Sequence, residues 1–332
     1  MINTKELNDI PFFFILSMGR SGSTLLEFLL DAHPNVNIPI ESRFIIHLYY
    51  TYANETKWTK ATKKRFIKDL YKDHKFATYW NVDKEKLEGE ILATLENISF
   101  FELCRIITKN YVSFYDKNEI KIQGSKNPIY ALLTDVLYSL NLESKFIHLV
   151  RNPLGVIASH KKLNKKNLTY FAYRWNLMNT KIEELKQKNP AQFITIKYEN
   201  LIKNPEQTMK EVGHFLEIDY LPEQLKFNEK LNLIKSKIDP IDEKEKMLLF
   251  NSYLKNIIYP INGSHSDSWK EILTSKEQKQ FNYITRDVSK KYNYNTSLPI
   301  GNFNLSYIFT RIIVKYRYLK LRFYYKFSLS LR

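Results

Sequence analysis

Short apolar runs alternate along the chain with longer stretches in which apolar residues recur every third or fourth position. The short runs are rich in β-branched and aromatic residues and predict buried parallel strands at residues 12–16, 36–38, 120–123, 146–150 and 193–196. Strands that alternate with helices are typical of the α/β class. We therefore expect an α/β fold with a central, mainly parallel sheet of about five strands, flanked by helices.

The longer stretches predict helices around this sheet and a helical insertion within it. Apolar spacing predicts helices at residues 24–32, 129–140, 154–163, 170–188, 205–216, 243–256 and 276–292. Four more are predicted between the second and third strands, at residues 43–53, 59–73, 84–97 and 100–115. We interpret residues 42–116 as an insertion that caps the sheet. No repeat or Gly-, Ser- or Pro-rich linker is present, so we expect one domain over residues 1–302 and a tail over 303–332.

Charge and cysteine content narrow the class of protein. Of the 332 residues, 51 are Lys or Arg and 35 are Asp or Glu, which gives a net charge of +16. This excess predicts an anionic partner such as a phosphorylated cofactor, an acidic glycan, an acidic lipid surface or nucleic acid.

The single cysteine, Cys104, excludes an intrachain disulfide framework, and we expect a reducing cytoplasm. No uncharged apolar run reaches the ~20 residues needed to span a bilayer.

Positive charge is concentrated in the expected tail. Residues 303–332 hold seven Lys or Arg residues, nine aromatic residues and no acid. On a helical wheel the basic residues are scattered rather than gathered on one face, which is poor for an interfacial amphipathic helix. Dense Lys and Arg among Tyr and Phe nevertheless favour an anionic leaflet. A C-terminal helix packed on the domain, with solvated charges, explains the same pattern, and both interpretations stay open.

A glycine-containing loop joins the first expected strand to the first expected helix. Two of the eight glycines in the chain fall within Ser17–Thr24. A strand, a glycine loop and a helix in this order predict a backbone socket for a phosphate, although an ordinary turn explains them too. Gly22 is followed by Ser23 rather than by the Lys of a Walker A loop, and the basic residue is Arg20. We therefore expect a 5′-phosphate with a singly charged neighbour, and no metal.

A second expected strand ends in a similar way. The strand at 146–150 is followed by Arg151-Asn152-Pro153 and then by a helix that carries Ser159. Ligands bind at the carboxyl ends of strands in α/β sheets, and an Arg fork beside a hydroxyl suits a phosphate. Taken alone, the segment is explained as well by a surface Arg and a helical Ser.

Together these segments resemble the PAPS-dependent sulfotransferases, which transfer a sulfonate from 3′-phosphoadenosine 5′-phosphosulfate (PAPS). Gly19–Thr24 is similar to the loop of that family that binds the 5′-phosphosulfate, and Val150–Pro153 with Ser159 is similar to its 3′-phosphate site. Leu30–Val36, followed by Glu41-Ser42-Arg43, is similar to a stretch of the tyrosylprotein sulfotransferase branch. The resemblance covers roughly residues 10–295 and implies a P-loop-type three-layer fold in a soluble, bacterial-type member.

The resemblance also implies roles for individual residues. It implies that the donor is bound by Gly19, Arg20, Ser21, Gly22, Ser23 and Thr24 at the phosphosulfate, by Arg151 and Ser159 at the 3′-phosphate, and by Tyr198, Trp269 and Lys270 around the nucleotide. It implies that Glu41 is the general base, and that Arg20 and Lys126 stabilise the transferring group. A helix N-terminal acid is the alternative interpretation of Glu41. His47 competes for the base role, and His148 is expected in the core.

The leading hypothesis is a cytoplasmic, metal-independent sulfotransferase that uses PAPS, releases adenosine 3′,5′-bisphosphate and modifies a carbohydrate or glycolipid hydroxyl. A tyrosine-directed protein sulfotransferase is the alternative within the family. An unusual P-loop kinase, and a non-catalytic module that binds polyanions or membranes, are the alternatives outside it. We expect no nucleic-acid partner, and contact of the tail with the inner face of the membrane is part of the hypothesis.

Overall fold

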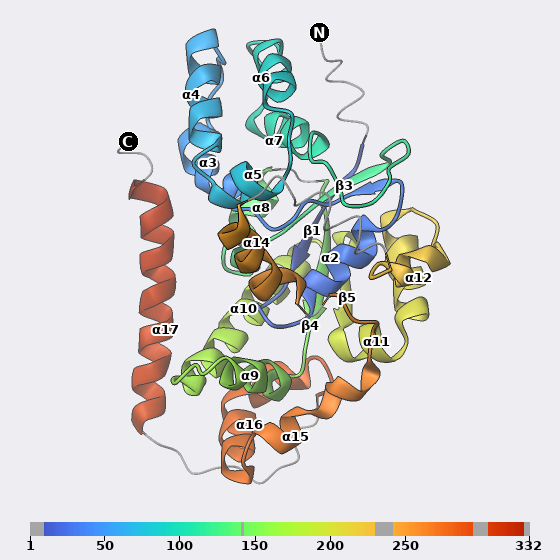
Figure 1. Cartoon of the computed structure of the whole chain (residues 1–332). Helices are drawn as coiled ribbons and strands as arrows, with labels where there is room; N and C mark the ends of the chain where they lie inside the picture. Colours follow the sequence, from blue (N-terminus) through green and yellow to red (C-terminus); the bar gives the residue numbers. More distant parts are fainter. Residues whose placement is uncertain (1–9, 141–142, 230–241, 256, 295–304, 329–332) are drawn as a thin grey trace.

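A five-stranded parallel sheet forms the centre of the part of the chain that the structure describes (Figure 1). The computed structural model describes residues 10–140, 143–229, 242–255, 257–294 and 305–328. The strands are β1 (Phe12–Leu16), β2 (Val36–Asn37), β3 (Ile122–Lys126), β4 (Lys145–Val150) and β5 (Phe193–Lys197), in the order β2-β3-β1-β4-β5. Every neighbouring pair is parallel, so the carboxyl ends of β1, β3 and β4 meet at one edge.

Helices cover both faces of the sheet because the central strands β1 and β4 carry apolar side chains on both sides. The helices that pack on the two faces are α3 (Phe44–Tyr52), α7 (Phe100–Lys109) and α10 (Leu168–Lys188) on one, and α2 (Ser23–Asp31) and α12 (Pro205–Leu216) on the other. In β1, Phe12 and Phe14 point to the first face, while Phe13 and Ile15 point to the second. The three-layer α/β fold expected from the sequence is confirmed.

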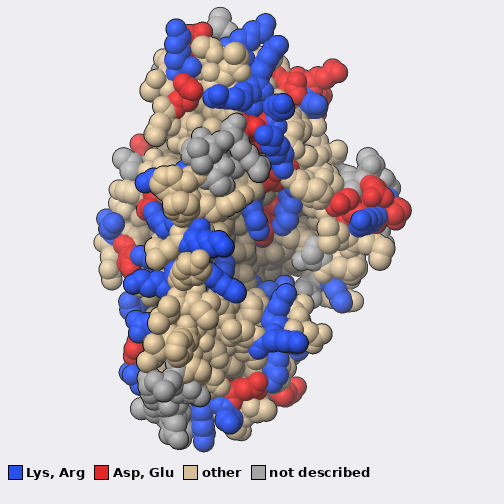
Figure 2. Space-filling model, turned by 90° about the vertical axis from the view of Figure 1, so that its left-hand side faces the viewer, with Lys and Arg blue, Asp and Glu red and all other residues tan. Residues whose placement is uncertain are grey.

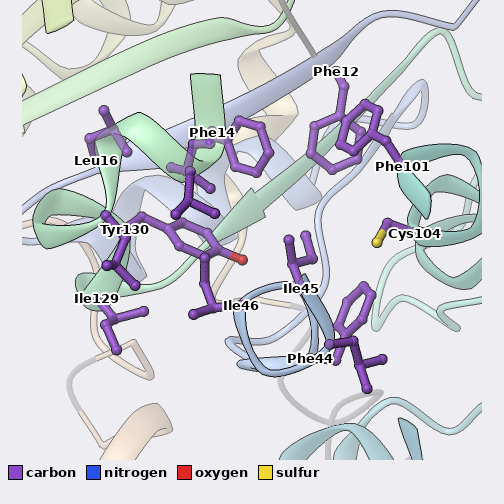
Figure 3. Close-up of a cluster of buried hydrophobic side chains, with 14 of the residues drawn as sticks. Phe12, Phe14, Leu16, Phe44, Ile45, Ile46, Phe101, Cys104, Ile129 and Tyr130 are labelled. Carbon is purple, nitrogen blue, oxygen red and sulfur yellow. The ribbon is translucent and has the colours of Figure 1, made fainter. Parts of the chain in front are cut away.

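Aromatic contacts dominate the larger hydrophobic cluster (Figure 3). The rings of Phe12 and Phe101 meet edge to face with centroids 5.2 Å apart, and those of Phe14 and Tyr130 do so at 5.6 Å. Cys104 of α7 is fully buried in the same cluster, where burial raises the pKa of its thiol. The contacts join the central strand to the insertion through its last helix.

The chain between β2 and β3 folds into five helices. These are α3, α4 (Lys60–Leu70), α5 (His74–Tyr79), α6 (Lys84–Leu92) and α7. The helix expected at 59–73 is α4, which ends early at Leu70. The sequence did not predict α5, which Asp73 caps by accepting a hydrogen bond of 3.0 Å from the backbone N–H of Phe76. The helices expected at 84–97 and 100–115 end early, at Leu92 and Lys109.

The third strand begins and ends later than the sequence predicted. It covers Ile122–Lys126 rather than 120–123, and its polar residues pointed wrongly to a loop. In the fold, the side chain of Gln123 donates to the backbone oxygen of Arg105 at 3.4 Å, which partly offsets its burial. Gly124 makes room for the ring of Phe13, since a Cβ at this position would lie 2.3 Å from that ring.

The other helices of the described residues lie near the carboxyl edge of the sheet or along the side of the molecule (Figure 1). They are α8 (Thr134–Leu140), α9 (Pro153–Lys162), α11 (Tyr198–Lys203), α14 (Glu243–Leu249), α15 (Trp269–Ile272), α16 (Ser275–Lys290) and α17 (Leu305–Phe323). A π-helical turn at Phe250–Leu254 continues α14 along the helix expected at 243–256, whose last residue lies outside the described residues. Figure 1 shows α17 running along the side of the molecule, where it packs against α10.

The expected tail is only partly described, since residues 303–304 and 329–332 lie outside the described residues. Among the helices that are described, none has both the length and the apolar character to cross a membrane.

Candidate active site

The loop after β1 turns sharply and opens α2. Arg20 and Gly22 have positive φ angles of 75° and 91°, and Gly22 is the N-cap residue of α2. Glycine is needed at position 22, because a Cβ there would lie 2.3 Å from the ring of Tyr198 and the backbone is left-handed. Within the described part of the chain no side chain caps α2, so its first backbone N–H groups are suited to an anion.

Two arginines and a serine from distant segments meet at this loop. The Nε atom of Arg20 donates to Oγ of Ser159 at 3.0 Å, and Nη1 of Arg151 donates to the backbone oxygen of Arg20 at 2.9 Å. The guanidinium of Arg151 lies 4.2 Å from the centroid of the Tyr198 ring. Trp175 of α10 donates from Nε1 to the backbone oxygen of Arg151 at 3.1 Å. These contacts tie the ends of β1 and β4 to α9, α10 and α11.

These residues line a cavity of about 870 Å³. The predicted donor residues on its wall are Arg20, Gly22, Ser23, Thr24, Arg151, Ser159 and Tyr198. Burial and the adjacent charge of Arg151 lower the pKa of Arg20. Among the described residues, the buried Nε atom of Arg151 has no hydrogen-bond partner. An anionic ligand would offset both features, so the cavity fits the phosphates of a nucleotide.

Four of the predicted donor residues are not on the wall of the cavity. Gly19 faces Pro128, and Ser21 is buried in the loop. Trp269 packs on the hydrophobic cluster of α9 and α16, and Lys270 forms an ion pair of 3.2 Å with Asp267. From this region Ser268 and Ile272 line the cavity instead.

The cavity also contains residues that sequence reasoning missed. Lys162 follows Ser159 by three residues on α9, and this helical spacing could have indicated it. Tyr253 and the segment 259–262 reach the cavity from a part of the chain with no recognisable motif. Nothing in the sequence around them signals this position.

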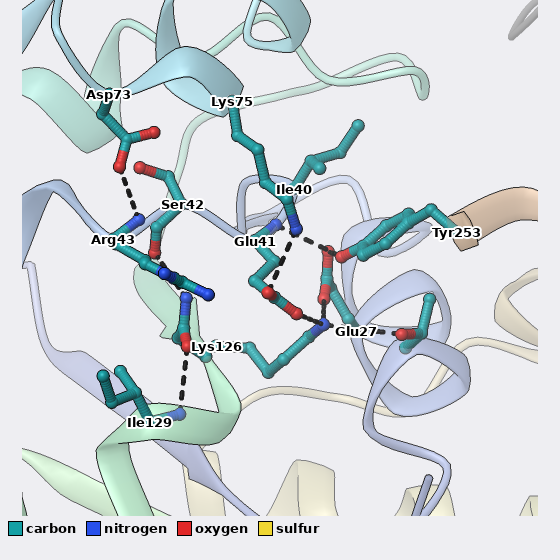
Figure 4. A network of polar contacts seen from close by, with 12 residues as sticks. Glu27, Ile40, Glu41, Ser42, Arg43, Asp73, Lys75, Lys126, Ile129 and Tyr253 are labelled. Atoms are coloured by element: carbon teal, nitrogen blue, oxygen red, sulfur yellow. Dashed lines mark hydrogen bonds and ion pairs between the residues drawn. The ribbon is translucent and has the colours of Figure 1, made fainter. Parts of the chain in front are cut away.

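Beside the cavity, Lys126 lies between two carboxylates (Figure 4). Its Nζ atom is 2.9 Å from Glu27 of α2 and 3.1 Å from Glu41, which lies between β2 and α3. Lys75 of α5 approaches the other oxygen of Glu41 at 3.1 Å. The predicted catalytic pair, Glu41 and Lys126, is therefore in direct contact, and Glu27 is a third member that sequence reasoning missed.

The charges of this cluster are unequal. Burial raises the pKa of Glu27 to about 7, although Lys126 opposes that shift. Burial acts in the same direction on Glu41, but Lys126 and Lys75 outweigh it and lower its pKa to about 2. Burial lowers the pKa of Lys126, but its two carboxylate partners outweigh that effect and raise the pKa, so its ammonium stays charged. Glu41 is thus ionised at neutral pH, whereas Glu27 titrates near neutrality.

Tyr253 and Thr24 join this cluster to the cavity, because both residues also line the cavity. The hydroxyl of Tyr253 donates to Glu27 and accepts a hydrogen bond of 3.2 Å from the backbone N–H of Glu41. Nζ of Lys126 donates to Oγ1 of Thr24 at 3.4 Å. A group bound at the loop after β1 is thereby next to a buried ammonium and a carboxylate.

The two histidines singled out from the sequence lie elsewhere. Nδ1 of His47 is 3.9 Å from Asp73, and its ring lies against Tyr325. His148 is buried in β4, where Nε2 is 2.9 Å from the side-chain oxygen of Asn179, as expected for a core residue. In the described residues, neither side chain is part of the Glu27, Lys126 and Glu41 cluster.

Comparison with known proteins identifies relatives of this arrangement. The chain matches the model of the sulfotransferase family over residues 11–223. A putative protein-tyrosine sulfotransferase of Caenorhabditis briggsae is 24% identical over 238 residues, which cover 70% of this chain and 73% of the relative. The protein-tyrosine sulfotransferase of Drosophila melanogaster is 22% identical over 270 residues, which cover 79% of this chain and 47% of the relative. This chain therefore spans about half the length of the fly protein.

Two solved structures share the fold. The sulfotransferase domain from the olefin synthase of Synechococcus PCC 7002 has a TM-score of 0.57 and 19% identity, over 86% of this chain and 95% of that domain. The sulfotransferase domain from the curacin biosynthetic pathway has a TM-score of 0.58 and 22% identity, over 87% of this chain and 99% of that domain. The family model covers more than half of the sequence, and its match includes the loop after β1, Lys126 and Arg151. This chain belongs to the sulfotransferase family and is a transferase enzyme.

Proposed function

We propose that this enzyme transfers a sulfonate from PAPS to an acceptor hydroxyl by in-line displacement. One observation carries the proposal: Arg20 contacts both Arg151 and Ser159, and all three residues line a single cavity. PAPS carries anionic groups at both its 5′ and 3′ positions. Two guanidinium groups that meet in one cavity are suited to such a ligand, whereas a ligand with one phosphate would leave part of their charge unmatched.

The residues of the cavity divide between the two ends of the donor. The N-terminus of α2, with Arg20, Ser23 and Thr24, would hold the 5′-phosphosulfate. Arg151 and Ser159 would hold the 3′-phosphate, with Lys162 one turn along α9 adding a third positive charge. We assign Tyr198 to the adenosine, and Trp269 and Lys270 to the outer rim of the same site. The lack of a Lys after Gly22 makes the loop a poor match for a nucleoside triphosphate with Mg²⁺, and the reaction in our proposal uses no metal ion.

Catalysis in this proposal needs a base for the acceptor and cations for the transferring group. The donor supplies the sulfonate, and Lys126 and Arg20 would stabilise the charge that develops on its oxygens. Glu41 would accept the proton of the acceptor hydroxyl. With two ammonium partners Glu41 is a weak base, since they hold its pKa at about 2. When Lys126 turns toward the sulfonate, Glu41 loses one partner and becomes more basic.

The acceptor in our proposal is a carbohydrate or glycolipid hydroxyl. The acceptor must approach Glu41, which contacts α5 of the insertion through Lys75, so the insertion helices would shape its binding site. A second candidate is a tyrosine hydroxyl of a protein. The relatives named as protein-tyrosine sulfotransferases favour this second candidate, although identity with them is 22–24%.

We also propose a cytoplasmic location, with contact at the inner face of the membrane. The only cysteine, Cys104, is a buried free thiol, so the chain does not depend on an oxidising compartment for an internal disulfide. The C-terminal helix carries the surface for the membrane contact.

Turnover of PAPS labelled in its sulfonate tests the function. The purified chain would be incubated with labelled PAPS and three acceptor classes: soluble oligosaccharides, glycolipids in detergent, and tyrosine-containing peptides. We expect label in the carbohydrate classes and release of adenosine 3′,5′-bisphosphate, both lost in Glu41→Gln. Label in the peptides alone would move the assignment to the second candidate. Phosphate transfer from ATP, without any sulfonate transfer, would overturn the proposal.

A further inference from the structure

The C-terminal helix α17 is fastened to the domain along one face. Tyr307 and Val314 of α17 are buried, as is Tyr325 in the π-helical turn at Tyr324–Ser328 that follows it. Tyr325 stacks on Tyr50 of α3 at a centroid distance of 6.4 Å. Arg322 forms two hydrogen bonds to the carboxylate of Asp135, at 2.9 Å and 2.6 Å. These contacts fix the rotation of the helix about its axis. The side chains on the opposite face therefore have a defined direction, away from the protein.

The opposite face of α17 is an apolar strip. Its members keep between 54% and 68% of their surface exposed and follow one another at intervals of three and four residues: Phe309, Ile312, Tyr316, Leu319 and Phe323. This interval is the helical repeat, so the side chains form one continuous line. Among the described residues nothing covers them. Contiguous exposed apolar surface of this kind marks an interaction site.

Basic side chains border this strip on both edges. At 3.6 residues per turn, Arg311 and Lys315 fall on one edge and Arg317 and Lys320 on the other, and all four are exposed. Figure 2 faces this side of the molecule, where Lys and Arg side chains lie among residues without a charge. The wheel of the whole helix scatters its basic residues, as the sequence suggested. Packing on the domain buries one face of α17, however. The face that stays exposed to solvent is the apolar strip with basic residues along both of its edges.

We infer that this strip is a docking surface for an anionic lipid bilayer, into which the apolar side chains insert while the basic edges meet the headgroups. Phe, Tyr, Ile and Leu would enter the boundary between headgroups and acyl chains, and Lys and Arg would reach the phosphates beside them. Charge complementarity selects this occupant over a second copy of the chain. Two copies paired through their strips would bring basic edges together, and α17 has no acidic residue to neutralise them. The inference stands apart from the donor cavity and does not depend on it.

Sedimentation with vesicles tests the surface. The full chain would be mixed with vesicles of phosphatidylcholine, with or without phosphatidylserine, and a double variant, Phe309→Ser with Leu319→Ser, would be compared with it. Leu95→Ser is the matched control, because Leu95 is 54% exposed like Leu319 but lies on the insertion. A second double variant, Lys315→Glu with Lys320→Glu, tests the basic edges. Light scattering would report the oligomeric state, and circular dichroism would report folding.

We expect the wild-type chain and the control to sediment with phosphatidylserine vesicles, more weakly as salt is added. The Phe309→Ser, Leu319→Ser variant should bind about tenfold more weakly or worse, because it removes apolar insertion. The Lys315→Glu, Lys320→Glu variant should bind about thirtyfold more weakly or worse, since two basic residues at roughly 1 kcal/mol each correspond to that factor. Their folding and their binding of adenosine 3′,5′-bisphosphate should be unchanged. Equal binding to neutral vesicles, or undiminished binding by the folded double variants, would overturn the inference. So would a dimer that the Phe309→Ser, Leu319→Ser variant dissociates, since the strip would then belong to a second copy.

Discussion

Arg151 donates a hydrogen bond of 2.9 Å to the backbone oxygen of Arg20, although the two residues are 131 positions apart in the sequence. The parallel pairing of β1 with β4 explains the contact, because it places the two strand ends beside each other. The arrangement brings two positive side chains to one cavity at the carboxyl edge of the sheet, where α/β folds bind ligands. It is the structural basis of the proposed donor site.

Arg151→Ala should reduce the preference for a 3′-phosphate. We expect its affinity for adenosine 3′,5′-bisphosphate to fall about tenfold or more, the cost of a lost charge-assisted phosphate contact. Affinity for adenosine 5′-monophosphate, which has no 3′-phosphate, should change little. Titration calorimetry with both nucleotides measures the ratio of the two affinities in the variant and in the wild type. Arg286→Ala, on the surface of α16, is the control and should bind as the wild type does.

Glu41→Gln should abolish turnover while nucleotide binding survives. The substitution keeps the shape of the side chain but removes the base, and loss of a general base costs about 10²–10⁴ in rate. Lys126 keeps its contact with Glu27 at 2.9 Å, so its charge remains paired. The rate of sulfonate transfer and the Kd of adenosine 3′,5′-bisphosphate check the two halves of this prediction. A variant that keeps most of its activity would contradict the assignment of Glu41 as the base.

Donor binding should weaken as the pH rises through about 7, the pKa of Glu27. Below that pH Glu27 is neutral, and the charge of Lys126 is shared only with Glu41 and the donor. Above it a second buried carboxylate competes for Lys126 and repels the anionic donor. The Kd of adenosine 3′,5′-bisphosphate at about pH 6 and about pH 8 measures the effect. In Glu27→Gln this part of the pH dependence should disappear.

Glu27 should also leave a signature in folding stability. Its pKa in the folded chain, about 7, lies above the ordinary value of 4.5. The folded state therefore holds a proton that the unfolded state releases, and the stability from this group is full below pH 4.5 and is lost as the pH rises to about 7. Urea unfolding of the wild type and Glu27→Gln across this window gives the difference. If the difference in the free energy of unfolding between the two proteins does not change with pH across this window, the pKa of Glu27 is not raised.

Substitution of two glycines by alanine should affect two different properties, donor binding at position 22 and stability at position 89. Gly22→Ala should abolish donor binding, because the left-handed backbone and the ring of Tyr198 leave no room for a Cβ. Gly89→Ala is the matched control, since among the described residues nothing outside the local backbone of its own helix lies within 4 Å of a Cβ at this position. It should raise the free energy of unfolding by about 0.5–1 kcal/mol, the helix propensity gained. Thermal melts with and without adenosine 3′,5′-bisphosphate separate the two effects.

The parts of the site that sequence predicted are those carried by short, contiguous motifs. The loop with Arg20 and Gly22 follows a strand and precedes a helix, and Arg151 with Ser159 repeats that order, so local sequence indicates both. The contact of Tyr253 with Glu27 could not be predicted, because 226 residues separate them and neither belongs to a motif. Glu27 looked like an ordinary polar residue of a helix, and only the fold turns it toward Lys126.

The predicted elements failed where tertiary contacts override local composition. β3 contains Gln123, Ser125 and Lys126, which signal a loop, but partners from other elements let these side chains be buried. Local capping explains a helix that was not predicted, because Asp73 caps α5, a helix of only six residues that is too short to show clear apolar spacing. The face of α17 that meets solvent depends on its packing against α10, which the sequence alone does not specify.

The crystal structure of the chain with adenosine 3′,5′-bisphosphate tests the central claim most directly. We expect one nucleotide in the cavity of about 870 Å³, with its 5′-phosphate at the N-terminus of α2 beside Arg20 and its 3′-phosphate in contact with Arg151 and Ser159. A nucleotide that binds outside this cavity, or that reaches only one of the two arginines, would contradict it.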